Sequence, residues 1–590
     1  MTDPVLRETS RIRCILLTGI SLWAAVIVSG SSYRSIFLLP AAIALYLLFR
    51  KAPAAERGAT AYVLAAVLTL SALLARYRQM TGGYESAVFQ IITLLIAACG
   101  LFVLLLYLFR HLSALSVRVS ESGLLSASRD KEARFPALRW FDAHPLLVSF
   151  AVCVIVRLPW FLYSFPGIAN PDSVSQLEQA ADVEALVNAH PVYHTLLLRL
   201  FLTIGGGVQS GTALYVIAQM LYMSFCCAYA VSFLRKLRLR RTVCLTALAF
   251  YALTPFMNVY SVIIWKDGPF AATLVLLSVS LFEMACAYRE GTPLSARLLL
   301  RFAALCTVTM LLRSNAALAV LPLLVLAAIA FRKQIPRVLP ALAAVAAVLL
   351  IALTLIPRAY GIGQSDLVEK LNLPVQQIAR VITEGNTLPE EDEALVREVL
   401  GERDVSLWYD PYYADTMKAM VRTGDQTYLE EHRGAFLSLY LRWGLRYPGS
   451  YLRAYGDLTG AMLYPDLTYG IAEAEGIYEN RIGLQWQPLL RGAFFVKLRE
   501  LVTRLPYRIP LLSLLWSCGT YAWMLLITAA LLWTQRSKRR YLALLAPAAA
   551  LFLVLLVSTP IASEFRYVFG IVMCAPLWLA APFLEEKGEA

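Results

Sequence analysis

The sequence predicts an all-α polytopic membrane protein with about 14 transmembrane helices, and two observations carry this prediction. Hydrophobic residues make up 59% of the 590-residue chain, and the mean hydropathy is +0.62, which is too apolar for an ordinary soluble protein. Apolar stretches that reach or approach the roughly 20 helical residues needed to cross a bilayer recur along the chain. They lie near residues 14–31, 35–50, 59–76, 88–109, 146–165, 211–234, 243–264, 268–287, 297–312, 315–331, 338–356, 510–533, 541–559 and 566–584.

The loops between these stretches predict the orientation of the chain. Lys and Arg are enriched in cytoplasmic loops, and the basic segments fall on one side if both termini are cytoplasmic and residues 191–207 do not cross. The stretch 191–207 is short, contains Arg199 and ends in glycines, so we expect a juxtamembrane helix on the outer face. The sequence therefore predicts a multi-pass plasma-membrane protein with cytoplasmic N- and C-termini. The basic segments are "RETSRIR", "RKAPAAERG", "RDKEARFPALR", "RKLRLRR", "FRKQIPR" and "TQRSKRR".

This topology divides the chain into four regions. Residues 1–142 form a four-helix membrane region with a cytoplasmic linker, and residues 143–357 form a membrane core whose first outer loop is 166–210. Residues 358–508 form a mostly helical extracytoplasmic domain, because helical patterns alternate there with breaks rich in Pro, Gly and Asp. Residues 509–590 form a C-terminal region of three membrane helices.

Charge and cysteine usage exclude several classes of protein. The formal net charge is +13, but residues 358–508 hold 21 of the 40 acidic residues against 17 Lys and Arg. The positive charge therefore lies mainly in the inner loops, where anionic membrane lipid attracts it, and no segment has the pattern of a nucleic-acid binder. None of the 10 cysteines falls in 358–508, so we expect no disulfide framework, and no Cys/His spacing suggests zinc.

A polar stretch, "YSFPGIANPDSVSQLEQA" at residues 163–180, follows the fifth apolar run directly. Asn170 suits a helix N-cap, Pro171 the first helical position, and Asp172 the first turn, where the helix dipole favours an acidic residue. Helix capping alone explains these three residues. The functional alternative is that Asp172, presented at the outer surface of the membrane, is a general base that takes the proton of an attacking hydroxyl.

Other charged residues are expected at the same level of the membrane. "IIWKDGPF" places Lys266 and Asp267 at the outer end of the seventh span. Arg313 interrupts a long apolar run, and Arg566 opens the last span beside Glu564. An arginine at membrane depth normally has an anionic partner. Arg566 therefore pairs either with Glu564 or with a lipid phosphate, which suits its planar guanidinium.

Two of the five histidines, His190 and His194, lie four residues apart in "NAHPVYHTLLL", on one face of the expected juxtamembrane helix. A histidine pair without a third ligand is weak support for a metal site. We therefore predict no metal ligand set and favour hydrogen bonds from these histidines to a substrate phosphate or hydroxyl.

Tyrosines cluster in two segments of the extracytoplasmic region, "LWYDPYYADTM" and "YPDLTYGIAEAEGIY". Aromatic faces with carboxylates nearby suit a sugar ring, which offers apolar C–H patches and hydroxyl groups. A belt of tyrosines at the level of the lipid headgroups explains the same composition equally well.

Taken in order, these motifs resemble the GT-C superfamily of membrane glycosyltransferases, which includes protein O-mannosyltransferases and lipid A aminoarabinose transferases. The shared features are an Asp in the first outer loop, a His-Pro juxtamembrane start, a second outer turn ending in "WKD", a long exported loop and a late Glu-x-Arg-Tyr. The resemblance covers residues 146 to about 584 and leaves out the first four spans. The motifs most similar to an uncharacterised bacterial multipass family of this type are "PGIANPDSVSQLEQA", "NAHPVYHTLL", "WKDGPF", "LRSN" and "LPVQQIARVI".

The resemblance implies roles for individual residues. Asp172 matches the acidic residue that serves as catalytic base, Asp267 the second-loop acidic residue that organises the site, and His190 the residue facing the donor phosphate. Two positions depart from the pattern. Ser173 follows Asp172 where many relatives have a second acidic residue, which leaves open whether a divalent cation assists, and Val192 stands where relatives have a proline. No other cofactor is implied.

The expected site has three parts. Asp172 is the catalytic residue. The donor phosphate is expected to contact Arg566, Arg313, Lys266 and His190. The remaining site residues are Asp267, His194, Ser173, Gln176, Glu564 and Tyr567.

The implied reaction moves a sugar from a polyprenyl phosphate to a cell-envelope acceptor, which is a glycan, a lipid or a protein, on the outer face of the membrane. Asp172 deprotonates the acceptor hydroxyl, a single displacement inverts the anomeric carbon, and cations stabilise the departing phosphate. The expected partners are the lipid-linked donor, the acceptor and membrane lipid, with no nucleic acid.

Two other classes of protein remain as alternatives. A transporter or flippase of lipid-linked glycans is expected to place charged groups along a path through the bilayer, often with internal repeats. The unusual polar residues gather instead on the outer face, with Arg313 ambiguous, and no repeated half is recognisable. A structural scaffold would give Asp172 and Lys266 no chemical role.

Overall fold

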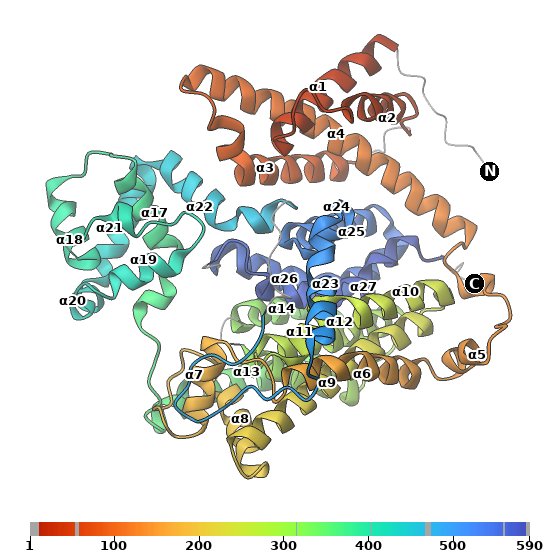
Figure 1. The fold of residues 1–590 in the computed structure, drawn as a ribbon. Helices are drawn as coiled ribbons and strands as arrows, with labels where there is room; N and C mark the ends of the chain where they lie inside the picture. The colour runs from red at the N-terminus through yellow and green to blue at the C-terminus, as the bar shows by residue number, and fades with distance from the viewer. Residues whose placement is uncertain are drawn as a thin grey trace.

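The computed structural model of the protein describes residues 11–53, 58–313, 316–401, 403–465, 474–558 and 561–585. Every regular element in this part of the chain is helical, and extended segments meet only in isolated bridges. Figure 1 shows a bundle of long helices that share one direction, with two smaller groups of helices attached to it. The prediction of an all-α protein is confirmed.

The first four helices form a layer of their own, red to orange in Figure 1. Gly100 lets two of them approach closely, because a Cβ at this position would lie 2.3 Å from the carbonyl oxygen of Ile20. The fourth helix, at 36 residues, is longer than the roughly 20 that a bilayer requires. It reaches the rest of the bundle, where the Ser120 hydroxyl donates to the Leu584 carbonyl. The helices are α1 (Arg11–Ser29), α2 (Leu38–Arg50), α3 (Thr60–Thr81) and α4 (Ala87–Ser122).

The membrane core is built around α12, which is apolar on all sides and contacts α9, α13, α26 and α27. A helix of this kind is expected in the centre of a bundle. The helices of this region up to residue 359 are α5 (Pro136–Ala143), α6 (Pro145–Ser164), α7 (Pro171–Ala180), α8 (Val192–Ile204), α9 (Val208–Lys236), α10 (Arg241–Leu253), α11 (Pro255–Val262), α12 (Asp267–Arg289), α13 (Ala296–Leu312), α14 (Ala316–Ala330), α15 (Ile335–Leu350) and α16 (Ile356–Ala359).

Residues 358–508 contain a group of short helices with a hydrophobic core of its own, centred on Val375, Ile378, Met417, Leu439 and Trp443. This group lies to one side of the bundle in Figure 1. Its last helix returns to the bundle and packs against α3 and α25. The helices are α17 (Asn372–Thr383), α18 (Glu390–Leu400), α19 (Ala414–Val421), α20 (Gln426–Glu431), α21 (Arg433–Arg446) and α22 (Pro448–Leu463).

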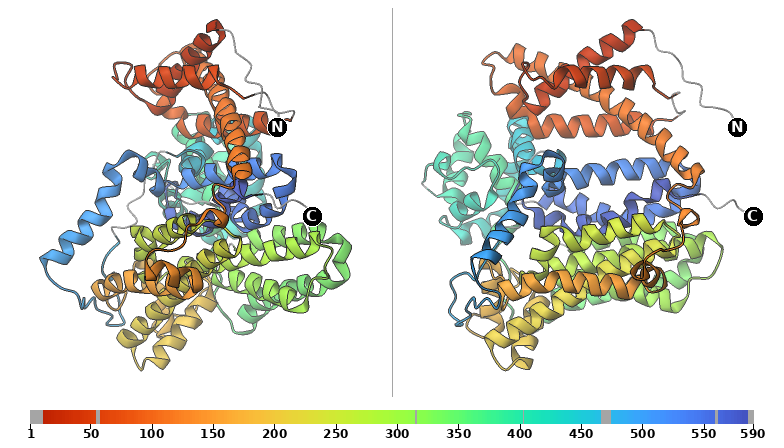
Figure 2. Two further views of the ribbon diagram at one scale, coloured as in Figure 1. Left: turned by 90° about the vertical axis from the view of Figure 1, so that its right-hand side faces the viewer. Right: turned by 45° about the vertical axis from the view of Figure 1, so that its right-hand side comes forward.

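The remaining helices complete the bundle. The first of them, α23, is amphipathic and runs across the end of the bundle rather than along it (Figure 2). The last, α27, is buried beside α12. These helices are α23 (Ala493–Arg508), α24 (Pro510–Ser513), α25 (Cys518–Thr534), α26 (Leu542–Ser558) and α27 (Phe565–Leu579).

The helices have the length and composition of a multi-pass membrane protein. Each predicted span overlaps one or more helices. Among the described residues, however, only nine helices are long and apolar enough to cross a membrane, or ten if α10 and α11 form one bent span. The prediction of about 14 spans is therefore not confirmed. The shortfall comes from four short helices, because α2, α13, α14 and α25 have 13, 17, 15 and 17 residues. The juxtamembrane helix α8, with 13 residues, is also shorter than a span requires.

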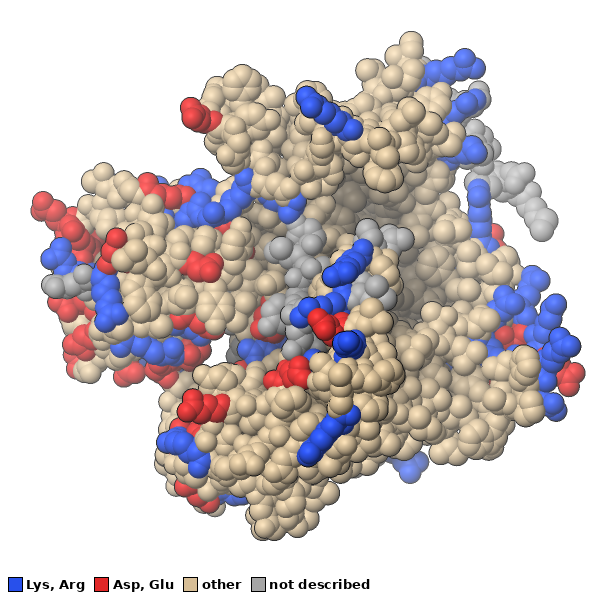
Figure 3. Space-filling model, in the orientation of Figure 1, with Lys and Arg blue, Asp and Glu red and all other residues tan. Residues whose placement is uncertain are grey.

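The two ends of the bundle carry different side chains. At one end, Arg235 pairs with Asp130 and Asp142, and Arg241 also pairs with Asp142, while Lys538 donates to the Pro582 carbonyl. The opposite end holds the α6–α7 loop, the α11–α12 turn and the start of α27. Figure 3 shows charged residues gathered at both ends and a mostly uncharged surface between them, which a further group of charged residues interrupts near the centre. A mostly apolar surface between two charged ends is expected of a membrane-embedded bundle.

Candidate active site

The site begins with a break in a membrane helix. The predicted span 243–264 is divided at Pro255 into α10 and α11, which are bent by 51°. Proline has no backbone N–H and clashes with the preceding turn, so it ends α10. The chain then leaves α11 in an extended conformation, and Ile263 forms a parallel bridge with Ile168. Two motifs almost a hundred residues apart, "FPGIANPD" and "IIWKD", therefore lie side by side.

Asp172 stands at the start of α7, as the capping pattern predicts. Asn170 Oδ1 accepts the backbone N–H of Ser173 at 3.0 Å, and Pro171 occupies the first helical turn. The Ser173 hydroxyl donates to the Ile264 carbonyl at 2.7 Å, which ties the helix start to the "WKD" turn. Helix capping and an exposed functional carboxylate are thus compatible, because Asn170 makes the cap and the Asp172 side chain remains 34% exposed.

The carboxylate of Asp172 is paired with the first arginine of the last span. Arg566 Nη1 lies 2.5 Å from Asp172 Oδ2, and Arg566 Nε lies 3.7 Å from Glu564 Oε1. The guanidinium carbon of Arg566 is also 5.2 Å from the ring centre of Trp265 and 5.3 Å from that of Tyr567. The sequence offered Glu564 or a phosphate as partner of Arg566, and the short contact is made instead with Asp172.

A second ion pair also lies beside Tyr567. Arg313 Nη1 is 3.1 Å from Asp267 Oδ1, and the Arg313 guanidinium carbon is 5.5 Å from the Tyr567 ring and 5.2 Å from the Phe270 ring. The Tyr567 ring is therefore shared by two arginines, each with its own aspartate. Residues 314 and 315, which complete the predicted "LRSN" motif, lie outside the described residues.

Lys266 brings a third cation to the cluster. Its Nζ lies 3.2 Å from Nδ1 of His190. Burial lowers the pKa of Lys266, while Asp267 and Asp172 act in the opposite direction. Burial also lowers the pKa of His190, to about 4, and the nearby Lys266 charge adds to this effect. His190 is consequently a neutral imidazole at physiological pH, available as a hydrogen-bond partner of Lys266.

Burial and the nearby positive charges shift the pKa of Asp172 in opposite directions. Burial by itself raises the pKa of this carboxyl, but the charges of Arg566 and Lys266 outweigh burial and lower the pKa to about 2. Asp172 is therefore ionised and firmly held in the substrate-free protein. A carboxylate with so low a pKa is a poor proton acceptor while the ion pair with Arg566 persists.

Three of the predicted site residues make hydrogen bonds to residues outside the charged cluster. His194 is fully buried, and its Nε2 lies 2.6 Å from the Tyr215 hydroxyl. Tyr215 donates to Gln219 Oε1, and Gln219 Nε2 donates to the Ile263 carbonyl at 2.6 Å. This chain of hydrogen bonds ends at the Ile263 carbonyl and so holds the backbone that leads into the "WKD" turn. The other two, Gln176, which donates to the Thr195 hydroxyl, and Ser173, lie in the scaffold rather than in the charged cluster.

Trp265 is a site residue that the sequence reasoning did not single out. Its ring lies under Arg566, and its Nε1–H is buried without an acceptor in the part of the chain that the structure describes. A buried donor left unpaired costs about 1–3 kcal/mol, so a ligand oxygen would stabilise this position. The signal was available, because Trp265 directly precedes Lys266 in the quoted motif.

Metal binding was left open by the sequence. Among the described residues, no group of three or more His, Cys, Asp or Glu side chains is arranged to hold a metal ion. The carboxylates of the cluster face arginines instead, as the pairs Asp172–Arg566 and Asp267–Arg313 show.

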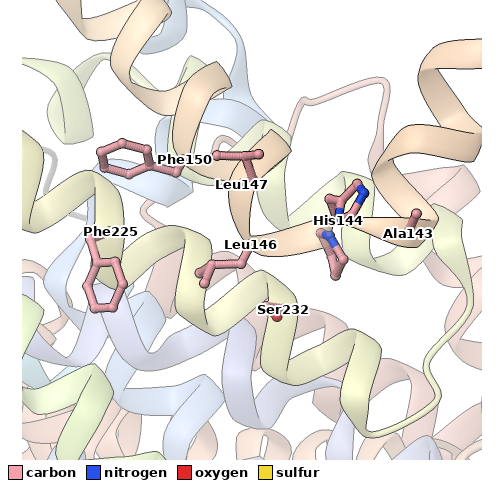
Figure 4. A pocket seen from close by; sticks show the side chains of 8 residues that line it. Ala143, His144, Leu146, Leu147, Phe150, Phe225 and Ser232 are labelled. Atoms are coloured by element: carbon pink, nitrogen blue, oxygen red, sulfur yellow. The ribbon is translucent and has the colours of Figure 1, made fainter.

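Two of the apolar cavities in the described part of the chain lie beside α6. One, of about 370 Å³, lies at the same end of the bundle as the charged cluster, between α6, the α10–α11 break and α23, and includes Trp160, Asn258 and Arg499. The other, of about 460 Å³, is shown in Figure 4 and lies near the start of α6, lined by His144, Leu147, Phe150 and Phe225 among others. This second cavity is at the basic end of the bundle and takes no part in the cluster.

The described helices are compatible with a multi-pass α-helical membrane protein, and a cluster of three cations and three carboxylates lies at one end of their bundle. The chain belongs to DUF6020, described as a family of unknown function, which matches residues 179–590. That match includes His190, Lys266, Asp267, Arg313 and Arg566, and begins after Asp172. No curated protein and no solved structure matches the chain.

Proposed function

We propose that the protein is an inverting glycosyltransferase of the GT-C type, which moves a sugar from a polyprenyl phosphate to a cell-envelope acceptor at the outer face of the membrane. The observation that carries the proposal is the paired cluster Asp172–Arg566 and Asp267–Arg313, joined through Tyr567 and flanked by Lys266. It offers both parts that the reaction needs, which are cations for a phosphate and a carboxylate for a proton.

The ion pair between Asp172 and Arg566 gives the site a way to create its base. A phosphate that enters the cluster attracts Arg566 and Lys266, because the planar guanidinium binds phosphate oxygens in pairs. The charge that held Asp172 is then shared with the substrate, and the pKa of the Asp172 carboxyl rises from about 2 towards its ordinary value. Donor binding thus releases the base.

The proposed chemical step is a single displacement. Asp172 takes the proton of an acceptor hydroxyl, and the hydroxyl oxygen forms a bond to the anomeric carbon of the donor sugar. The bond between this carbon and the phosphate oxygen breaks, and the polyprenyl phosphate leaves with the bonding electron pair. Arg566, Arg313 and Lys266 stabilise its additional negative charge, and the configuration at the anomeric carbon inverts.

The apolar cavity of about 370 Å³ beside α6 supports a lipid-linked donor. Its lining is mostly apolar, with Trp160, Leu253 and Leu498 among its residues, and such a surface suits a segment of hydrocarbon chain. The cavity lies at the end of the bundle that carries the charged cluster, so a lipid in it would bring its phosphate to that end.

Loop charge supports an extracytoplasmic site. The end of the bundle opposite the cluster carries Arg235, Arg241 and Lys538, and basic loops are retained on the cytoplasmic side. The cluster and residues 358–508 would then face the cell exterior, with both termini inside.

A flippase of lipid-linked glycans is the alternative, and it would need charged groups along the membrane path. Arg157 of α6 is such a group and is fully buried. It donates to the Ser224 hydroxyl at 2.7 Å and to the Tyr251 carbonyl at 3.3 Å, which caps the broken end of α10. These contacts favour a structural part for Arg157 over a transport part.

Release of polyprenyl phosphate tests the proposal. The purified protein in lipid nanodiscs is given a panel of polyprenyl-phosphate sugars, and the lipid product is measured by mass spectrometry with and without envelope glycan from a strain lacking the gene. We expect one donor to yield polyprenyl phosphate, faster when glycan is present. Lipid-linked sugar that crosses the bilayer of a proteoliposome intact would support the flippase instead.

A further inference from the structure

A segment of the extracytoplasmic domain reaches the lip of the candidate active site. Tyr413 forms an antiparallel bridge with Ile561, and the N–H of Ala562 donates to the Tyr412 carbonyl at 2.9 Å. Ile561 and Ala562 lie three and two residues before Glu564, which pairs with Arg566 in the charged cluster. The backbone of "WYDPYY" is therefore fixed to the start of the last membrane helix.

The shape of this segment is set by local hydrogen bonds. Asp410 Oδ1 accepts the N–H of Tyr412 at 2.8 Å, and Pro411 restricts the backbone between them. The Asp410 carbonyl accepts Nε2 of Gln376 from α17 at 3.0 Å. The turn is thus held from both sides, and the two tyrosines that follow it have a defined place.

The rings of these tyrosines remain open. Tyr412 is 47% exposed and Tyr413 is 38% exposed, so part of each ring is accessible to a ligand. Burial raises the pKa of the Tyr413 hydroxyl, and the charges of Asp415 and Glu564 raise it further. Tyr413 therefore lies in the field of a carboxylate of the active-site cluster.

The N-terminal helices support the segment from behind. Arg78 of α3 places its guanidinium carbon 6.0 Å from the ring centre of Tyr412, and its Nε donates to both carboxylate oxygens of Asp457 at 2.7 and 2.9 Å. Asp457 of α22 is 5% exposed and also accepts Arg380 Nη1 at 3.0 Å. A chain of contacts therefore runs from α3 to Tyr412.

We propose that Tyr412 and Tyr413 form the wall of the site that binds the acceptor, that the acceptor is a glycan, and that Arg78 positions this wall. The inference rests on the proposed function and adds the class of acceptor. The wall belongs to the extracytoplasmic domain, whereas the donor lipid lies in the bilayer, so the wall faces the substrate that arrives from the water. Open tyrosine rings stack on the C–H faces of a sugar, and nearby carboxylates accept its hydroxyl groups.

Steady-state kinetics in nanodiscs test the wall. The probe is envelope glycan from a strain lacking the gene, with the donor identified above, and the variants are Tyr412→Ala, Tyr413→Ala and the ring-preserving Tyr412→Phe. We expect each alanine variant to raise the KM for glycan by about 3- to 10-fold, with the KM for donor unchanged. Tyr412→Phe should stay within about 2-fold of the wild type, because the stacking face is kept. Tyr360→Ala, at a tyrosine that is 80% exposed and outside the segment, is the matched control.

Arg78→Gln tests the positioning part. We expect it to raise the KM for glycan without changing donor cleavage by water, and Arg78→Lys should restore part of the effect because it retains the charge facing Asp457. A general structural role would lower both activities together.

The outcomes separate this inference from the proposed function. If the wild type releases no polyprenyl phosphate from any donor, the proposed function fails. If it does, but Tyr412→Ala and Tyr413→Ala match Tyr360→Ala or raise only the KM for donor, the acceptor wall is wrong while the function stands.

Discussion

Arg566 is the residue on which the account depends most, because it contacts Asp172, Glu564, Trp265 and Tyr567 at once. The pair with Asp172 is not a simple stabilising bridge. It keeps the carboxylate charged, and in the proposed mechanism an incoming phosphate competes for the guanidinium. We propose that this exchange lets an aspartate with a depressed pKa later accept a proton.

Substitution of Arg566 tests this exchange. Arg566→Lys keeps the charge but loses the planar fork, so we expect weaker donor binding. Arg566→Gln removes the charge, and we expect turnover to fall at least about 100-fold, in line with the loss of one preorganised oxyanion-stabilising group. The measurement is polyprenyl phosphate release under donor saturation. Equal turnover in the glutamine variant and the wild type would contradict a role of Arg566 in the reaction.

His190 predicts how stability depends on pH. Its pKa is lowered from the ordinary 6.5 to about 4, so between these values the unfolded chain binds a proton that the folded protein does not. The contribution of His190 is therefore intact above pH 6.5 and decreases as the pH falls towards 4. The lowered pKa of Asp172 acts in the same direction, but only below about pH 3.8.

The matching variant is His190→Asn, which does not titrate. We expect the wild type to lose more thermal stability between pH 7.5 and pH 5 than this variant does, as measured by unfolding in nanodiscs. His432→Asn, at an exposed histidine of the extracytoplasmic domain, should follow the wild type. An equal loss in all three proteins would show that His190 is not held neutral.

At the scale of elements, the break between α10 and α11 places the site. The carbonyls at the end of α10 find partners in side chains, because Asn258 Nδ2 donates to Ala252 and Thr254 and Arg157 donates to Tyr251. These bonds satisfy backbone groups that a broken membrane helix would leave unpaired. The broken helix then delivers Lys266 and Asp267 to the cluster.

Asn258→Leu tests the importance of the break. The substitution leaves carbonyls of α10 without a donor, and an unsatisfied buried group costs about 1–3 kcal/mol. We expect a lower melting temperature and weaker donor binding together, because the "WKD" turn shifts with α11. Thr246→Ala, at an exposed residue of α10 outside the cavity of the proposed donor, should change neither. A stable but inactive Asn258→Leu protein would show that the residue acts on the substrate instead.

The sequence predicted those features of this region that depend on residues close together in the chain. The Asn170 cap and the first turn at Asp172 follow from local preferences and are confirmed. The bend at Pro255 was missed, although the proline itself was the signal. The pairing of Asp172 with Arg566 joins residues 394 positions apart, and a single sequence contains no local information about such contacts. His194 was assigned to the site by helical spacing alone, and its buried partner Tyr215 lies on another helix.

For the whole molecule, the close contact between α3 and α22 connects the N-terminal layer to the rest. Gly456 and Gly460 form a small-xxx-small pattern on α22, and a Cβ on Gly456 would lie 2.5 Å from the Leu74 carbonyl oxygen. Asp457 between them binds Arg78 of α3. The first four helices lie outside both the GT-C resemblance and the DUF6020 match, yet α3 packs against α22 of the region 358–508.

Gly456→Val tests whether the contact between α3 and α22 supports the candidate site. The added side chain cannot fit against the α3 backbone, and overpacking of this kind costs about 1–3 kcal/mol. We expect a lower melting temperature and a higher KM for the glycan acceptor. Gly434→Val is the control, because this helical glycine has open space around it and should lose only a little helix stability. If both variants behave alike, the α3–α22 contact does not support the site.

The central claim is that Asp172 is the base of a sugar transfer, and the most direct measurement is the glycan composition of the cell envelope. A native-host strain lacking the gene is complemented with the wild type, with Asp172→Asn, or with Asp182→Asn at matched expression. Asp182 is a suitable control because its side chain is 75% exposed and its positive φ of 59° suits asparagine equally well. We expect one sugar to disappear on deletion and to return only with the wild type and with Asp182→Asn. Full restoration by Asp172→Asn would contradict it.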